Sequence, residues 1–205
     1  MKKIIINDDH YLIGGKKYVR TTKVLDIIAK EELYRWFARY GMKYCNRHTE
    51  RRASFGTKFH KYAEMLVGGK GKDVNWIAMN DEMFNTVNMF MDWAKHHELE
   101  PKHLEHHMHN DKYMYAGTAD FIGWYDGKKY LIDWKTAKRI YPNYYLQLAA
   151  YVYMYEQSTN DKLDGFMIAR FRDGKVETKE KDRKECDEYF QLFLAALKLW
   201  RWKHK

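Results

Sequence analysis

The stretch Tyr130-Leu131-Ile132-Asp133-Trp134-Lys135-Thr136 alternates apolar and charged side chains in the manner of a β-strand. Side chains two apart in a strand share a face, so Asp133 and Lys135 would point the same way while Ile132 and Trp134 pack on the other side. Such a triplet is also typical of a surface ion pair on a half-solvated strand, because short motifs often occur by chance. The sequence before it decides between the two readings.

A second carboxylate lies one predicted hairpin away. Gly117-Thr118-Ala119-Asp120 precedes an apolar run at residues 121–125, and Asp126-Gly127 is a strong hairpin turn. Pairing of the two strands would bring Asp120 next to Asp133, with Lys135 beside them. Two carboxylates can hold Mg2+ or Mn2+, and an adjacent lysine can orient or activate the water that attacks a phosphodiester. The pattern therefore favours metal-dependent phosphodiester chemistry.

Five ordered blocks of the sequence resemble the PD-(D/E)XK nuclease superfamily, nearest its RecB-like and phage-exonuclease branch, which includes the mitochondrial genome maintenance exonuclease. The blocks are Gly56-Thr57-Lys58-Phe59-His60, Glu105, Gly117-Thr118-Ala119-Asp120, Ile132-Asp133-Trp134-Lys135-Thr136 and Gln147-Leu148-Ala149-Ala150-Tyr151. Residues 18–22 and 33–36 resemble the N-terminal region of the family more weakly. Ala119 replaces the proline that gives the family its name, a departure common in this branch that leaves the neighbouring carboxylate intact.

The resemblance implies an α/β, restriction-endonuclease-like fold, with a central mixed β-sheet flanked by helices and an additional N-terminal hairpin and helices. It implies one or two Mg2+ or Mn2+ ions. The implied metal ligands are His60, Asp120, Asp133 and the backbone carbonyl of Trp134. Lys135 would be the catalytic lysine, and Glu105 would support the metal site or its water.

Contacts with DNA are predicted from the resemblance and from the charge of the chain. The predicted DNA-binding residues are Thr136, Lys138, Arg139, Gln147 and Tyr151. Lys138 and Arg139 follow the catalytic strand directly, and Gln147 and Tyr151 match a helix motif of the family. The sequence has 37 Lys and Arg against 28 Asp and Glu, a formal net charge of +9 that favours a polyanionic partner.

Simpler interpretations of these residues stay open. His60 lies in a predicted helix over residues 59–67 and could be structural, and the aromatic stripe that includes Tyr151 could be core. Glu105 alternates with His103, His107 and His109, so a strand would display all four on one face. That cluster weakly suggests zinc, although the sequence supplies no closed set of further ligands for it.

Length and composition predict one domain over residues 1–205, with a hairpin and helix in 1–55 and a nuclease core in 56–205, because no Pro/Gly/Ser-rich linker divides the chain. Neither a 20-residue apolar span nor a signal peptide is evident, so we expect no membrane partner and a cytoplasmic protein, compatible with a phage-encoded one. The only two cysteines, Cys45 and Cys186, fit a reducing compartment and exclude a four-cysteine iron–sulfur cluster.

Local patterns predict the order of the elements. The predicted helices span about 23–40, 59–67, Asn80 or Asp81 to 98, from Pro142 through Tyr151, and from Arg183 to the C-terminus. The predicted strands form a hairpin over 11–19, a catalytic sheet near 103–109, 118–125 and 129–136, and a second hairpin over 166–171 and 175–179.

The resulting hypothesis is a metal-dependent DNA exonuclease that hydrolyses phosphodiester bonds from ends and leaves 5′-phosphates, because the resemblance is strongest to end-processing enzymes. The alternatives are a structure- or sequence-specific endonuclease and a non-catalytic DNA-binding module of the same fold. The intact set of Asp120, Asp133 and Lys135 argues against the last.

Overall fold

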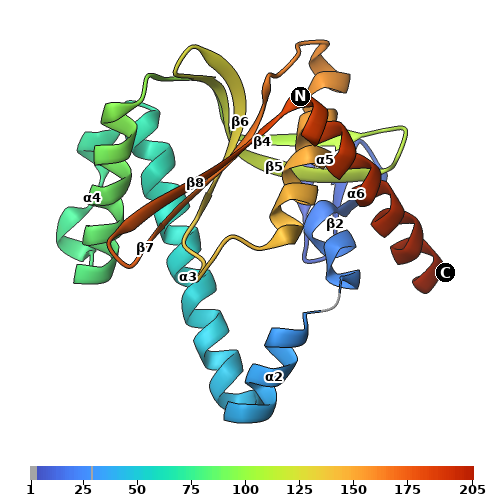
Figure 1. Ribbon diagram of the computed structural model, residues 1–205, viewed down its shortest axis with the longest axis horizontal. Coiled ribbons are helices and arrows are strands. Elements are labelled where there is room, and N and C mark those ends of the chain that lie inside the picture. The colour runs from blue at the N-terminus through green and yellow to red at the C-terminus, as the bar shows by residue number, and fades with distance from the viewer. Residues whose placement is uncertain (1–3, 29) are drawn as a thin grey trace.

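A computed structural model describes residues 4–28 and 30–205, and it contains an eight-stranded mixed sheet with helices on both faces (Figure 1). This confirms the predicted fold class. The strands are β1 (Ile4–Ile6), β2 (His10–Ile13), β3 (Lys16–Arg20), β4 (Leu99–Asn110), β5 (Tyr115–Tyr125), β6 (Lys128–Lys135), β7 (Gly165–Arg172) and β8 (Lys175–Asp182). The helices are α1 (Thr21–Val24), α2 (Glu31–Tyr40), α3 (Met42–Val67), α4 (Asp81–His96), α5 (Pro142–Thr159) and α6 (Arg183–Lys203), with 3-10 turns at Leu25–Ile27, Gly71–Asp73 and Trp76–Ala78.

Strand β5 is the centre of the sheet, and its two edges pair with different strands. One edge pairs with β4 from Tyr115 to Tyr125, antiparallel. The other edge is shared: β3 pairs in parallel with Tyr115 and Ala116, and β6 pairs antiparallel with residues 121–125. Within the described chain, residues 117–120 of that edge have no ladder partner, so the sheet opens there.

Two hydrophobic cores lie on the two faces of the sheet. Helices α5 and α6 cover one face, where Leu148 and Phe193 are fully buried. Helices α3 and α4 cover the other, where Phe59, Phe90 and Trp134 are fully buried. Figure 1 shows the two helix pairs on opposite sides of the strands. The opening in β5 therefore lies between α3 and α5.

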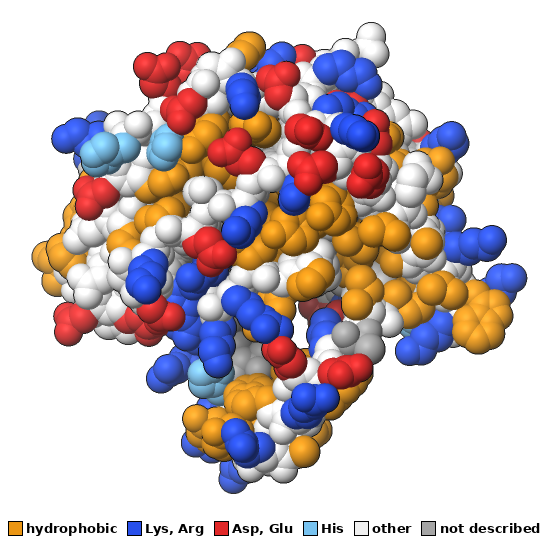
Figure 2. Space-filling model, in the orientation of Figure 1, with side chains coloured by type: hydrophobic (Ala, Val, Ile, Leu, Met, Phe, Trp, Pro, Cys, Tyr) orange, Lys and Arg blue, Asp and Glu red, His pale blue; other side chains and the backbone are white. Residues whose placement is uncertain are grey.

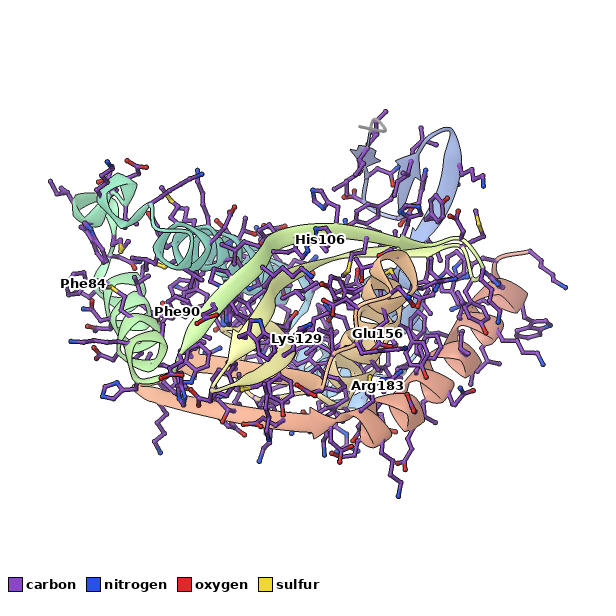
Figure 3. All side chains as sticks on the ribbon, turned by 90° about the horizontal axis from the view of Figure 1, so that it is seen from above. Phe84, Phe90, His106, Lys129, Glu156 and Arg183 are labelled. Atoms are coloured by element: carbon purple, nitrogen blue, oxygen red, sulfur yellow. The ribbon has the colours of Figure 1, made fainter. Side chains whose placement is uncertain are left out.

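Helix starts follow the local chemistry of the sequence. The Asn80 side chain accepts a hydrogen bond of 2.9 Å from the backbone N–H of Met83 and caps α4. Pro142 occupies the first turn of α5, where its missing N–H is not needed. Asp182 and Glu185 form a reciprocal capping box at the start of α6. Figure 3 shows Glu156 of α5 close to Arg183 of α6, and their ion pair measures 3.1 Å.

Two predicted helix boundaries are wrong. The single helix predicted over 23–40 is divided into α1, a 3-10 turn and α2, with Ile28 extended between them. The reason is packing: Val24 and Leu25 are buried in the α5–α6 core, whereas α2 buries no residue. The helix predicted from Phe59 begins at Met42, so residues 56 and 57 lie inside α3 and not ahead of it.

The N-terminal half of α3 and all of α2 form an arm that projects from the sheet (Figure 1). Its exposed aromatic residues include Tyr34, Tyr40 and Tyr44. Figure 2 shows hydrophobic side chains and Lys and Arg side chains together on this lower part of the molecule. None of the described helices is both long enough and apolar enough to cross a membrane.

Candidate metal-binding and catalytic cleft

A cleft of about 870 Å3 occupies the opening in the sheet. Its walls come from β5 and β6, from α3 and α5, and from the N-terminal strands. Strand β3 pairs with one end of β5 and strand β6 with the other end. The unpaired residues 117–120 between them therefore face this space and not a neighbouring strand. Loss of ladder pairing thus produces the cavity into which polar side chains project.

Asp120 lies at the floor of the cleft and is held from two sides. Its Oδ2 accepts a hydrogen bond of 2.8 Å from the backbone N–H of Trp134, and its Oδ1 lies 3.2 Å from Nδ1 of His60. The last β5–β6 pair is Phe121 with Ile132, so Asp120 and Asp133 stand one residue beyond it on adjoining strands. The predicted convergence of the two carboxylates across the hairpin is present.

Asp133 and Lys135 share a face of β6, as the alternation predicted. Nζ of Lys135 lies 2.6 Å from Oδ2 of Asp133 and 4.8 Å from the ring centroid of Tyr144 on α5. Ile132 and Trp134 are fully buried in the core on the other face. The strand therefore presents an acid and an amine to the cleft while its apolar side chains anchor it.

Glu105 reaches the same cleft through a local backbone irregularity. Its backbone φ is +45°. Glu105 and Asp120 are not paired in the β4–β5 ladder, although the residues before and after each of them are. Ligand atoms of His60, Glu105 and Asp120 all lie within 4.8 Å of one another. Three elements, α3, β4 and β5, thus place an imidazole and two carboxylates around one point.

The expectation that His103, Glu105, His107 and His109 share one face holds only in part, because Glu105 and His107 both line the cleft whereas His103 does not. His103 stacks on His106 with ring centroids 4.3 Å apart, and both rings contact Tyr155 of α5, away from Glu105. Figure 3 marks His106 on β4. The irregular backbone at Glu105 breaks the period-two alternation on which that expectation depended.

Burial and close charges shift the protonation of the cleft residues. Burial raises the pKa of Glu105 to about 7, and the negative charge of Asp120 adds to the shift. Burial likewise raises the pKa of Asp133 to about 6, despite the opposing effect of Lys135. Burial lowers the pKa of His60, but the Asp120 carboxylate outweighs it and raises the value to about 9. The close carboxylates therefore oppose one another's ionisation and favour the protonated form of His60.

The chemistry of the donors fits a hard divalent cation. Carboxylate oxygens and an imidazole nitrogen are suitable ligands for Mg2+ or Mn2+. Oδ2 of Asp133 is buried and, apart from its ion pair with Lys135, has no hydrogen-bond partner among the described residues. The Lys135 ammonium, 2.6 Å away, is the cation that compensates the burial of this carboxylate oxygen.

Gln147 and Tyr151 form the α5 wall of the cleft. Nε2 of Gln147 donates a hydrogen bond of 3.2 Å to the Tyr151 hydroxyl, and both residues are buried and line the cavity. Gly117 makes room for the Tyr151 ring, because a Cβ at position 117 would lie 2.2 Å from Cε1 of Tyr151. The motif residues thus brace β5 against α5.

The other predicted DNA contacts lie outside the cavity lining. Thr136 is buried next to Gly56 of α3. Lys138 follows it in the β6–α5 connection, where its carbonyl accepts a hydrogen bond of 3.4 Å from Arg170. Arg139 is bound to Glu32 of the arm at 2.5 Å. None of these three side chains is part of the cleft lining.

Several cleft residues were not predicted from the sequence. The Thr118 hydroxyl lies 2.9 Å from the Tyr11 hydroxyl and 2.7 Å from Nδ1 of His107, and all three residues line the cavity. Glu64 and Lys61 of α3 also line it. The spacing of His60 and Glu64, four apart on a helix, was a usable signal for Glu64. Tyr11 had none, because strand β2 is distant in sequence.

Comparisons with known proteins give information about the fold and none about the chemistry of the cleft. No protein-family model and no curated protein matches the sequence. Among solved structures, a protein from Eubacterium rectale that is provisionally described as an exonuclease has a TM-score of 0.54 and 15% identity, over 90% of this chain and 81% of that one. The structure of SSO0001 has a TM-score of 0.41 and 14% identity, over 86% of this chain and 75% of that one, too low to carry an argument. At 15% identity the first likeness shows a shared fold.

Proposed function

We propose that this chain is a metal-dependent deoxyribonuclease of the PD-(D/E)XK type that degrades DNA from ends and leaves 5′-phosphates. The observation that carries the proposal is the convergence of Asp120, Asp133 and Lys135 at the opening of the sheet, with His60 3.2 Å from Asp120. Two carboxylates and a lysine in a cleft are the groups that such hydrolysis requires. The shared fold with the Eubacterium rectale protein supports the same class of enzyme.

Each cleft residue would have a separate role in the reaction. His60, Asp120, Asp133 and the Trp134 carbonyl would hold Mg2+ or Mn2+, with Glu105 supporting the site. A bound divalent ion supplies Lewis-acid stabilisation of the scissile phosphate and a more acidic water. Lys135, as an ammonium, would orient the attacking water and stabilise charge that grows on the phosphoryl oxygens in the transition state. The backbone N–H of Trp134 fixes the orientation of Asp120.

The surroundings of the cleft favour a DNA strand as substrate. The formal net charge of the chain is +9, and Arg20 and Lys61 line the cavity itself. Cationic side chains attract the phosphate backbone without reading base sequence. Lys138 and Arg139, in the connection that follows β6, would contact phosphates further along the DNA strand.

The deciding experiment uses end-labelled linear DNA and covalently closed circular DNA, single- and double-stranded, with Mg2+, Mn2+ or EDTA. We expect degradation of linear DNA with metal, none with EDTA, and intact circles. Cleavage of circles would replace the exonuclease by the endonuclease alternative. Binding without cleavage under every metal condition would favour the DNA-binding module.

Variants connect the activity to the cleft. Asp133→Ala and Lys135→Ala should each abolish cleavage while circular dichroism and thermal unfolding stay cooperative. The matched control is the exposed ion pair of Asp26 with Lys30, 2.8 Å apart on the N-terminal segment, whose Lys30→Ala variant should cleave at the wild-type rate. Undiminished turnover by the Lys135→Ala protein would disprove the assigned mechanism.

A further inference from the structure

Lys135 has a second neighbour besides Asp133, and it comes from a different element. Its Nζ lies 4.8 Å from the ring centroid of Tyr144, in the first turns of α5. That distance is within the range of an attractive cation–π contact. The Lys135 side chain is only 17% exposed, so water screens the contact weakly. The two groups come from the catalytic strand and from the helix that closes the cleft.

The Tyr144 ring is itself held in place. It contacts Tyr141 edge-on with ring centroids 5.7 Å apart and packs against the α5–α6 core. Tyr144 lies three residues before Gln147 and seven before Tyr151, so the three residues share one face of α5. Among the described residues, the Tyr144 hydroxyl makes no hydrogen bond, which leaves the aromatic face as its means of contact with Lys135.

We propose that Tyr144 is a positioning residue that holds the Lys135 ammonium in its catalytic place. The inference rests on the proposed function and deepens it. The carboxylate of Asp133 would be shared between Lys135 and a metal ion. When Asp133 binds the metal, its attraction for Lys135 weakens, and the metal repels the ammonium. An aromatic ring carries no net charge, so it attracts the ammonium without competing for the metal or accepting a proton.

The first measurement is made without metal and without DNA. Tyr144→Leu removes the aromatic face at similar volume, and it is introduced both into the wild-type chain and into the Lys135→Met variant. A double-mutant cycle on the unfolding equilibrium should give a coupling of about two- to fivefold between the two positions. Equal destabilisation by Tyr144→Leu in the two backgrounds would mean that the ring only packs, and would overturn the proposal.

The second measurement is single-turnover cleavage of linear DNA with Mg2+. We expect Tyr144→Leu to lower the cleavage rate constant by about two- to fivefold, the same factor as in the unfolding cycle, with DNA affinity and Mg2+ affinity unchanged. Tyr144→Phe keeps the ring face and should restore the wild-type rate. A Tyr144→Phe protein as slow as Tyr144→Leu would also overturn the proposal.

The matched control is the next residue of the same helix. The Tyr145 ring lies 5.7 Å from Nζ of Lys181 and stacks on Tyr189, away from the cleft. Tyr145→Leu should therefore destabilise the fold but leave the cleavage rate unchanged. If the wild-type protein cleaves no DNA with any metal, the proposed function fails, while the metal-free cycle still shows whether Tyr144 holds Lys135.

Discussion

At the scale of single residues, the contact between Gly117 and Tyr151 explains why a motif requires a glycine. The Tyr151 ring is buried and hydrogen-bonded to Gln147, so it cannot move aside for a Cβ that would lie 2.2 Å from it. Gly117→Ala should destabilise the protein by about 1–3 kcal/mol through overpacking. It should also lower cleavage, because β5 carries Asp120 three residues later. Urea unfolding and the linear-DNA assay measure the two effects.

Substitution of Gly56 is the control for the Gly117→Ala variant. It lies inside α3, and an added Cβ would be 3.6 Å from Oγ1 of Thr136, an ordinary contact. Gly56→Ala should therefore stabilise the helix by about 0.5–1 kcal/mol. If Gly117→Ala were as stable as Gly56→Ala, the tight packing of β5 against Tyr151 would be disproved.

The same scale shows which site residues could be read from the sequence. Asp120, Asp133 and Lys135 were predictable because a hairpin turn and period-two alternation are local properties. Glu105 was identified only by resemblance, since its route into the cleft depends on a φ of +45° that alternation cannot anticipate. The contact of Tyr144 with Lys135 was not predictable, because it depends on how α5 docks on β6.

At the scale of elements, the start of α4 tests how far local capping stabilises the fold. Asn80 accepts a hydrogen bond from the N–H of Met83, which otherwise has no partner inside the helix. Asn80→Ala should cost about 1 kcal/mol. For a chain of this size that corresponds to a fall in Tm of about 2–4 °C. Asn85→Ala, at an exposed position within the same helix, is the control and should not lower Tm, because alanine has the higher helix propensity.

Asp161 connects three elements and predicts acid sensitivity. Its carboxylate lies 2.6 Å from Nζ of Lys129 on β6 and 2.9 Å from Nζ of Lys102 on β4, and it accepts a 2.9 Å hydrogen bond from Tyr155 of α5. The hydrogen bond from Lys129, followed by that from Lys102, holds the pKa of Asp161 well below its usual value. The charged form therefore stabilises the fold above the unfolded-state pKa, and this stability disappears as pH falls toward the lower folded-state pKa.

Asp161→Asn should accordingly lose about 1 kcal/mol of unfolding free energy at pH 7, a value reduced by partial exposure to solvent. The difference from wild type should shrink below about pH 4, where the carboxyl of the unfolded chain becomes protonated. Urea unfolding at pH 7, 5 and 3 measures this difference. Asp73→Asn, at an exposed position, should show no such pH-dependent difference, and a constant gap for Asp161→Asn would contradict the explanation.

Element boundaries were predictable where the signal is local. The hairpin turned by Gly14 and Gly15, the Asn80 cap and Pro142 all act within a few residues, and each appears where it was predicted. The division between α1 and α2 was not predictable, because it depends on which segment finds the α5–α6 core. Periodicity in sequence shows that a segment can be helical, but not what it packs against.

At the scale of the whole molecule, the site depends on a strand order that the sequence does not contain. Strand β3 joins β5 in parallel through Val19 and Tyr115, far apart along the chain, and this pairing leaves residues 117–120 open. Parallel pairing of distant strands has no turn signal to reveal it. The resemblance therefore predicted a mixed sheet. The divided edge of β5, which forms the cleft, could be seen only in the structure.

Divalent ions should stabilise the whole fold through this cleft. His60, Glu105 and Asp120 converge from three elements, and Asp133 adds a buried carboxylate, so a bound ion would offset repulsion that the folded chain otherwise retains. Binding to the folded state alone contributes about 2.7 kcal/mol when the ion is at 100 times its Kd. We therefore expect saturating Mg2+ or Mn2+ to raise Tm by about 5–10 °C, and EDTA to reverse the shift.

Asp120→Asn separates this effect from general screening of charge. The amide keeps its size and can remain beside the Trp134 N–H, but it is a weaker metal ligand than the carboxylate. The variant should keep a cooperative transition in EDTA and lose most of the Tm increase with Mg2+, while the same ionic strength supplied as NaCl should reproduce none of the wild-type increase. An equal Mg2+ shift in both proteins would locate the ions outside the cleft, and the divided edge of β5 would then have no role in binding them.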